Sequence, residues 1–335
     1  MNRIRQFWHY ARKIFDLPRH LRSVRDERVD PLVPTGAVTA TLFLGALLRR
    51  PSFLQIQADS QRPGWQRLID YAGPLNDECL AYVSERYRLE DLRAVLVWVN
   101  QSFKRNKVFE SAKIDGLLVV EIDANEQFKS RSRCCEHCRQ RTVKIKDAAG
   151  QEQEVTEYYH YQVYAHLHGP DFSTVLDLET IGPGEEEAPA AVRMLGRMRR
   201  NYGPRFFDVV TLDAWYAKGP TIKSIQKLGW APVAVLKQER YEVYQEATVL
   251  AQAQPALPFA WEDRQVELKE VRDLPFTDEA IGPVRVVCAE EKWEEVQRQG
   301  PSRVRVAKQS HWRWLSTEEL DGYSQKTIWR IGHHR

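Results

Sequence analysis

The pattern of apolar and polar residues predicts alternating strands and helices in the middle of the chain. Apolar or alternating runs too short for a typical helix predict strands, at 117–123, 157–168, 173–180, 206–213 and 232–237. Helical patterns at about 185–200 and about 215–228 separate the last three strands. The order β-β-β-α-β-α-β predicts an α/β fold with a mixed sheet flanked by helices.

The regions on either side show different patterns. Before the sheet, helical patterns fall at 38–48, 77–87 and 89–103. After it come a helical piece at 241–253 and strand-like runs at 265–268, 284–288, 304–306 and 312–315. The capping-type sequence Ser316-Thr317-Glu318-Glu319 predicts the start of a final helix. We therefore divide the chain into a helical N-terminal region, a core, a β-rich insertion and the start of a C-terminal helix, at 1–110, 111–237, 238–315 and 316–335.

Two of the predicted strands end on an aspartate. Asp123 follows the apolar run that begins at Leu117, and Asp213 follows the run that begins at Phe206. An acid that only caps a strand faces water, as most aspartates do. A buried carboxylate, in contrast, needs a partner or a metal ion. Two strands that each deliver a carboxylate at the same end would build a site for a divalent metal ion.

Composition and charge narrow the class of protein. The length of 335 residues allows two or three domains. With 43% hydrophobic and 28% charged residues, the composition favours a folded core over global disorder. The net charge of +3 does not by itself indicate a polyanionic partner. Basic residues gather in 1–30, which indicates either binding to nucleic acid or an anionic surface, or a solvated helix face.

The N-terminal pattern also bears on location. The apolar run at 37–48 is shorter than the roughly 20 residues that a membrane helix needs. A signal-peptide pattern is not present. We expect a cytoplasmic protein with no membrane partner.

Three of the five cysteines lie close together, at Cys134, Cys135 and Cys138. An odd count with this crowding does not suit a disulfide framework. The single C-x-x-C pair is half of the usual zinc signal, and Cys134 with His160 or His166 could complete a set of four ligands. The alternative is a loop of reduced thiols. Cys79 and Cys288 are expected to pack as small apolar residues.

The chain resembles the DDE transposases of bacterial insertion sequences. The segment EIDANEQFKSRSRCC around Asp123 looks like the first acid of that family, and VVTLDAWYA around Asp213 looks like the second, with Tyr216 three residues later. Val235-Leu236-Lys237 resembles the family's fifth strand and its terminal lysine. The resemblance implies an RNase H-like catalytic core interrupted by a β-rich insertion.

The resemblance also implies a reaction. Transposition hydrolyses a phosphodiester and then joins the freed 3′-hydroxyl to target DNA. In such enzymes Mg²⁺ or Mn²⁺ supports both displacements. Asp123 and Asp213 would hold the ion, because hard cations prefer carboxylate oxygens. The expected partners are transposon ends, target DNA and a second copy of the chain in the active complex.

Several residues near the predicted strand ends are candidate DNA contacts. Phosphate contacts are expected from Arg131, Arg133, Lys218 and Lys237. Tyr216 and Trp215 could stack on unpaired bases, although an aromatic residue at a helix start can equally pack in a core.

The tail at 328–335 resembles the run just before the family's third acid. We therefore expect the 335-residue chain to hold two of the three carboxylates and to be inactive alone. Two alternatives remain open at this stage: a DNA-binding regulator without catalysis, and an RNase H-like nuclease that cuts but does not join.

Overall fold

The structure is a computed structural model that describes residues 2–146, 150–237, 241–276, 278, 281–299 and 302–334. The first three residues of the predicted insertion, 238–240, and Arg335 of the tail lie outside these residues. The chain divides into two compact units, Met1–Asn106 and Lys107–Arg335. Each unit is described by itself.

The N-terminal unit is helical, as its apolar periodicity predicts. Its helices are α1 (Asn2–Phe15), α2 (Leu17–Ser23), α3 (Thr35–Leu47), α4 (Phe53–Ser60), α5 (Pro63–Ile69), α6 (Asp77–Ser84) and α7 (Leu89–Arg105). Side chains of α1 and α2 pack with α3 in one hydrophobic core that includes Trp8, Leu21 and Val38. Among the described residues, no helix of either unit is long and apolar enough to cross a membrane.

Residues 1–30 therefore do not form a free basic extension. Arg25 makes a two-point ion pair with Asp91 of α7, at 2.8 and 2.9 Å, and Arg28 pairs with the buried Asp26. Arg19 and Arg22 also lie near acidic partners, at 3.6 and 3.7 Å, but these exposed pairs contribute little to folding.

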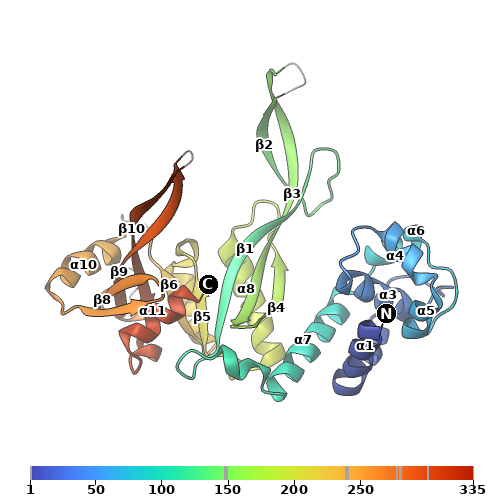
Figure 1. The fold of residues 1–335 in the computed structure, drawn as a ribbon, viewed down its shortest axis with the longest axis horizontal. Helices are drawn as coiled ribbons and strands as arrows, with labels where there is room; N and C mark the ends of the chain where they lie inside the picture. Colours follow the sequence, from blue (N-terminus) through green and yellow to red (C-terminus); the bar gives the residue numbers. More distant parts are fainter. Residues whose placement is uncertain are drawn as a thin grey trace. The chain divides into compact units, whose positions relative to one another are not determined.

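Within the described part of the second unit, ten strands form one mixed sheet, which confirms the predicted fold class (Figure 1). The order is β2-β3-β1-β5-β6-β10-β9-β8-β7, and β4 pairs with β3 on its other side. The strands are β1 (Val119–Ser130), β2 (Arg139–Lys146), β3 (Glu152–Gly169), β4 (Phe172–Thr180), β5 (Val209–Leu212), β6 (Ala231–Val235), β7 (Leu257–Trp261), β8 (Arg264–Leu274), β9 (Val284–Gln299) and β10 (Ser302–Ser316).

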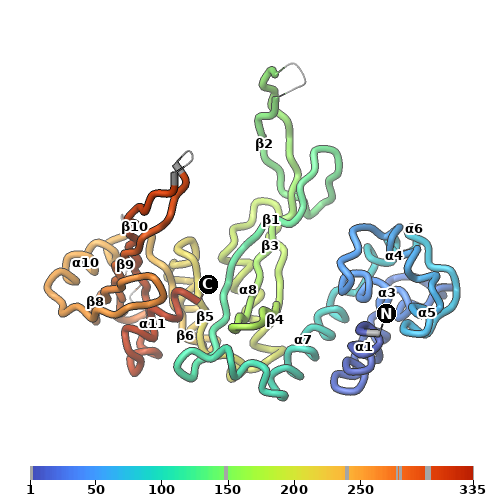
Figure 2. Tube along the Cα trace, in the orientation of Figure 1, coloured from blue at the N-terminus to red at the C-terminus, as the bar shows by residue number. Residues whose placement is uncertain are grey.

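The predicted core strands occur in the predicted order, but β2 was not predicted, because its segment was expected to be part of a polar loop. Strand β1 pairs with β3 in antiparallel fashion and with β5 in parallel, and β5 pairs with β6 in parallel. The first and fourth predicted strands, β1 and β5, are therefore neighbours, as the RNase H-like resemblance implies. One boundary was wrong: β1 does not end on Asp123 but continues to Ser130, because its polar second half pairs with β3 over residues 158–163. This half of β1 runs with β2 and β3 into a long hairpin (Figure 2).

Helices cover the sheet. The helical elements of this unit are η1 (Val108–Ala112), α8 (Glu187–Tyr202), η2 (Ala214–Tyr216), α9 (Gly219–Lys227), α10 (Glu242–Leu250), η3 (Ala251–Ala253), η5 (Glu318–Leu320) and α11 (Gln325–His333). Helices α8 and α9 contact each other; α8 also contacts β4, and α9 contacts β6.

The β-rich insertion extends the core sheet instead of forming a separate layer. Strand β10 pairs with β6 in antiparallel fashion, with Leu315 opposite Ala234. The two runs predicted at 304–306 and 312–315 are one strand, because the polar residues between them pair with β9. Strand β7 was not predicted.

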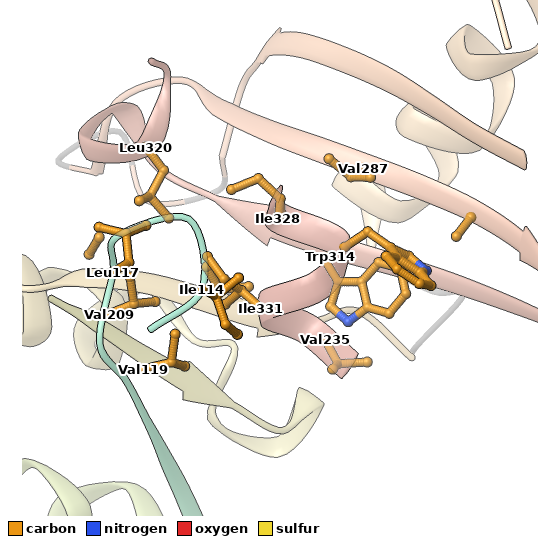
Figure 3. Packing of buried hydrophobic residues seen from close by; sticks show 14 of the residues in the cluster. Ile114, Leu117, Val119, Val209, Val235, Val287, Trp314, Leu320, Ile328 and Ile331 are labelled. Atoms are coloured by element: carbon orange, nitrogen blue, oxygen red, sulfur yellow. The ribbon is translucent and has the colours of Figure 1, made fainter. Parts of the chain in front are cut away.

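Helix α11 returns from the insertion to the core sheet. Ile328 and Ile331 pack among Val119, Val209 and Val235, which lie on one face of β1, β5 and β6 (Figure 3). The predicted helix start at 316–319 was wrong, because that segment forms only the short η5 turn. The true cap is Ser324, whose hydroxyl accepts a hydrogen bond from Thr327 N–H at 3.1 Å.

The end of α11 is held by a buried carboxylate, Glu291 of β9. The Glu291 side chain has no exposed surface. It accepts hydrogen bonds from Trp329 Nε1 at 3.0 Å and from Arg264 at 2.8 Å, and it contacts His333 Nε2. The His333 ring lies among four tryptophan rings at centroid distances of 4.8–5.8 Å, from Trp261, Trp312, Trp314 and Trp329. Burial is thus compensated by charge and hydrogen bonds from several elements.

We predict that Glu291→Ala lowers the free energy of unfolding by about 3–5 kcal/mol, because removing one member of a buried ion pair leaves the other charges unpaired. Guanidinium unfolding followed by tryptophan fluorescence measures this. Glu290→Ala is the matched control, since Glu290 is the next residue and its side chain is 51% exposed. Equal losses in the two variants would contradict the assignment.

The same carboxylate predicts a pH dependence. Burial would raise the pKa of Glu291, but hydrogen bonds from His333 and Trp329 outweigh it and lower the pKa from 4.5 to about 2. Its contribution to stability is therefore complete above pH 4.5 and is lost as pH falls toward 2. Comparing wild type with Glu291→Gln across this window should show a steeper acid loss in wild type.

Candidate functional site

The register of β1 and β5 brings the two predicted acids together. The last paired residues of these parallel strands are Ile122 and Leu212. Asp123 directly follows Ile122, and Asp213 directly follows Leu212. Neighbouring strands lie about 5 Å apart. The position of Asp213 in extended backbone, as the cap of η2, continues the direction of β5.

Both acids point to the face that α11 covers. Side chains alternate between the two faces of a strand, so Asp123 shares its face with Val119, and Asp213 shares its face with Val209. Both valines belong to the cluster under α11. Asp123 is exposed and Asp213 is partly exposed, so both carboxylates are accessible at the carboxyl ends of the strands. This edge is where open α/β sheets bind their ligands.

Lys237 lies at the same edge. It follows β6, and its Nζ lies 3.0 Å from Asp213 Oδ1. The side chains of Lys237 and Asp213 are 52% and 33% exposed, so solvent screens this ion pair. Exposed pairs contribute about 0–1 kcal/mol. Asp213 is therefore placed to attract a cation and is only weakly held by the present one.

Asp123 lines a hollow of about 330 Å³ on β1 and β3. The other residues that line it are Glu121, Asn125, Gln127, Tyr164, His166 and His168. His168 Nε2 lies 3.1 Å from Glu121 Oε2. His334, just after α11, makes a 2.9 Å hydrogen bond from its ring to the carbonyl oxygen of His168. The end of α11 thus lies beside this hollow.

Sequence reasoning missed the groups around Asp123. Glu121 is two residues earlier, and the period of two along a strand already places it on the same face. Burial lowers the pKa of His166, and His168 lowers it further, while Glu121 and Asp123 oppose the shift. The histidines come from β3, so finding them required the β1–β3 register.

The two aromatic candidates after Asp213, Trp215 and Tyr216, differ in their exposure to solvent. Tyr216 is only 1% exposed, and burial together with Glu187 raises its pKa. A ring this buried offers no face to a base, so the structure does not support Tyr216 as a stacking residue. Trp215 is 52% exposed. Lys218 lies 5.2 Å from the Trp215 ring and 3.1 Å from Glu186.

Arg131 and Arg133 lie elsewhere. Both are exposed in the loop that follows β1. The rise of a strand puts them roughly 20–25 Å from Asp123. The expectation that they share one edge with Lys218 and Lys237 was therefore wrong, because β1 is longer than its apolar part.

The same loop contains a cysteine–histidine cluster. Cys135 Sγ lies 3.7 Å from Cys138 Sγ and 3.1 Å from His160 Nε2. Cys134 and His166, which were candidates for the set, are not part of this group. Cys288 is buried, as expected, and Cys79 packs against the N-terminal core.

No protein-family model matches this chain, and no curated protein matches it. Among solved structures, the chain is similar to the piggyBac transposase in a cryo-EM structure of its synaptic complex with hairpin DNA. The TM-score is 0.36 and the sequence identity is 9%. The match covers 94% of this chain and 61% of that chain. A similarity at this level carries no argument about activity.

The hollow generates a prediction that needs no metal. Asp123→Asn should lower the pKa of His166 further below 6.5, because it removes one of the negative charges that oppose the shift. Histidine ring signals in NMR, followed through a pH titration, measure this. Asp171→Asn, at an exposed turn after β3, is the control and should leave the pKa unchanged. If the pKa of His166 is the same in Asp123→Asn and in wild type, Asp123 does not interact with His166 across the hollow.

Proposed function

We propose that this chain is one of the DNA transposases of insertion sequences, enzymes that hydrolyse a phosphodiester and transfer the strand in a metal-dependent reaction. One observation carries the proposal. Asp123 and Asp213 directly follow a paired position on neighbouring parallel strands and share one face. The fold supports it, since the sheet places these acids at its carboxyl edge.

The donor set at this edge fits Mg²⁺ or Mn²⁺. Both ions prefer oxygen ligands, and Mg²⁺ is usually held by one or two carboxylates together with substrate phosphate. Asp213 already pairs with the ammonium group of Lys237. The bound ion would supply activation of the attacking oxygen and stabilisation of the leaving oxygen.

The remaining groups have separate tasks in this proposal. Lys237 pairs with Asp213 in the free protein, and it contacts a DNA phosphate when Asp213 binds the metal ion. Trp215, with an exposed ring, stacks on an unpaired base beside the cut. Arg131 and Arg133 hold DNA at a distance from the acids, where they position the substrate.

The N-terminal unit adds a further basic surface. Arg3, Arg5, Arg12 and Lys13 are exposed on α1 and have no acidic partner among the described residues. The basic side chains of α1 can therefore contact DNA phosphates without breaking an ion pair of the folded unit. The two rival functions differ in a strand-transfer assay: a regulator binds only, and a nuclease cuts without joining.

We predict that Asp123→Asn and Asp213→Asn each weaken Mn²⁺ binding by at least about tenfold, because each removes a carboxylate ligand from a hard cation. Isothermal titration calorimetry in the absence of DNA measures the affinity. Lys237→Met should strengthen Mn²⁺ binding, since it removes the competing cation at 3.0 Å.

Lys227→Met, on an exposed position of α9, is the control for Lys237→Met and should change nothing. If Mn²⁺ binds wild type and both aspartate variants with the same affinity, the two acids do not form the metal site. The circular dichroism of each variant should match wild type, because both carboxylates are accessible to solvent.

DNA binding should depend on salt through α1. Neutralising Arg12 by Arg12→Gln should reduce the slope of log affinity against log salt by about 0.9, the value for one lost phosphate contact on duplex DNA. Arg22→Gln is the matched control, because Arg22 already pairs with Asp70 at 3.7 Å. Fluorescence anisotropy over a salt series measures both slopes. Equal changes in the two variants would remove α1 from the interface.

A further inference from the structure

The loop between β1 and β2 brings three soft metal ligands to one point. Cys135 and Cys138 come from the loop, and His160 comes from β3. Their ligand atoms all lie within 4.8 Å of one another. We propose that Cys135, Cys138 and His160 bind a zinc ion that holds this loop against the hairpin. This site is independent of the proposed function, because it shares no residue with the acidic edge.

The distances within the cluster suit zinc. Two thiolates at about 2.3 Å from a tetrahedral zinc ion lie roughly 3.8 Å apart, and a thiolate and an imidazole nitrogen lie roughly 3.5 Å apart. The sulfur atoms of Cys135 and Cys138 are 3.7 Å apart. His160 Nε2 is 3.1 Å from Cys135 Sγ, so a small opening of this contact admits the ion.

The backbone orients the two sulfur atoms. Cys135 N–H donates a hydrogen bond to Cys138 Sγ at 3.3 Å, which holds that sulfur beside Cys135. Cys138 N–H donates to Cys135 O at 3.0 Å and closes the turn between the two cysteines. The sequence C-x-x-C thus folds so that both sulfur atoms face the same side.

The strand register supplies the third ligand. Phe128, seven residues before Cys135, pairs with His160 across β1 and β3, and their rings lie 5.6 Å apart. This contact fixes the imidazole beside the start of the loop. Two loop cysteines and one strand histidine are therefore joined across 25 residues of sequence. Such a link restrains a loop more than the C-x-x-C turn could restrain it.

Three protein ligands leave one position of the tetrahedron to solvent. Cys135 is exposed, so water reaches the cluster. Cys134 is the adjacent residue but lies outside the group, which makes it a control within the same loop. Soft sulfur ligands select zinc over the hard cations that suit the acids of β1 and β5.

The zinc ion would order the loop between β1 and β2, which contains Arg131 and Arg133. Ser130 Oγ accepts hydrogen bonds from Ser132 and Arg133 N–H at 3.2 and 2.9 Å, which holds the first half of the loop. The cysteine–histidine site would hold the second half. Removal of zinc should therefore release the loop, so that its backbone fits the active site of trypsin more readily and cleavage at its arginines becomes faster.

The test measures metal content in the full chain. The protein is purified under reducing conditions without chelator, and zinc is quantified by mass spectrometry of the metal. We expect one zinc per chain, and a cobalt-loaded sample should show the thiolate-to-metal absorption of a tetrahedral site. Cys135→Ser, Cys138→Ser and His160→Asn should each weaken zinc binding by roughly a hundredfold, since even outer-shell partners typically contribute 10–100-fold.

Cys134→Ser is the matched control and should retain the zinc and the cobalt spectrum. Chelation should speed tryptic cleavage at Arg131 and Arg133 in wild type but not in Cys135→Ser. The proposal is overturned if wild type holds no zinc, if Cys134→Ser loses zinc as Cys135→Ser does, or if mass spectrometry finds a Cys135–Cys138 disulfide in place of the metal. Asp123→Asn should keep its zinc, so failure of the acidic site would not be mistaken for failure here.

Discussion

The buried carboxylate of Glu291 is the constraint on which the second unit, Lys107–Arg335, depends. Its charge is stabilised by Arg264 from β8, Trp329 and His333 from α11, so one side chain ties the insertion to the returning helix. Without that anchor, α11 would leave the apolar face of β1, β5 and β6 uncovered. Gly332 shows how close the fit is, because a Cβ at this position would overlap the Trp314 ring. The insertion thus serves the core by positioning a helix over it.

Helix α11 covers the same face of the sheet on which Asp123 and Asp213 lie. The valines of β1 and β5 under α11 lie on the same face as Asp123 and Asp213, and the acids begin where the cover of α11 ends. At its other end the helix is fixed by Asp115, which accepts a hydrogen bond from Thr327 at 2.7 Å. The buried valines and the exposed acids therefore follow one another along the same face of β1 and β5, because every second side chain of a strand points to the same face.

Local sequence patterns predicted the apolar core strands and their order, because a buried strand requires an apolar run, but they missed the polar strand β2. The expectation that Asp123 and Asp213 are neighbours came from the resemblance, because the first and fourth predicted strands are adjacent in an RNase H-like sheet. They failed where pairing is not local. The polar end of β1 and the polar middle of β10 are strands only because β3 and β9 pair with them. The partnership of Cys135 with His160 likewise depends on register, and the burial of Tyr216 depends on the packing around α8.

Strand β1 links the two proposed metal sites, which differ in the chemistry of their ligands. Its apolar first half carries Asp123 into an edge of oxygen ligands, and its polar second half leads to the sulfur and nitrogen ligands of the loop. Hard and soft donors select different ions, so magnesium or manganese at one end and zinc at the other need not compete. The distance between them is set by the extended length of the strand, roughly 15–17 Å over the five residues from Asp123 to Phe128, which pairs with His160. Because β1 and β3 pair along this whole distance, a loop ordered by zinc would present Arg131 and Arg133 at a fixed distance from the acids, which a flexible loop could not do.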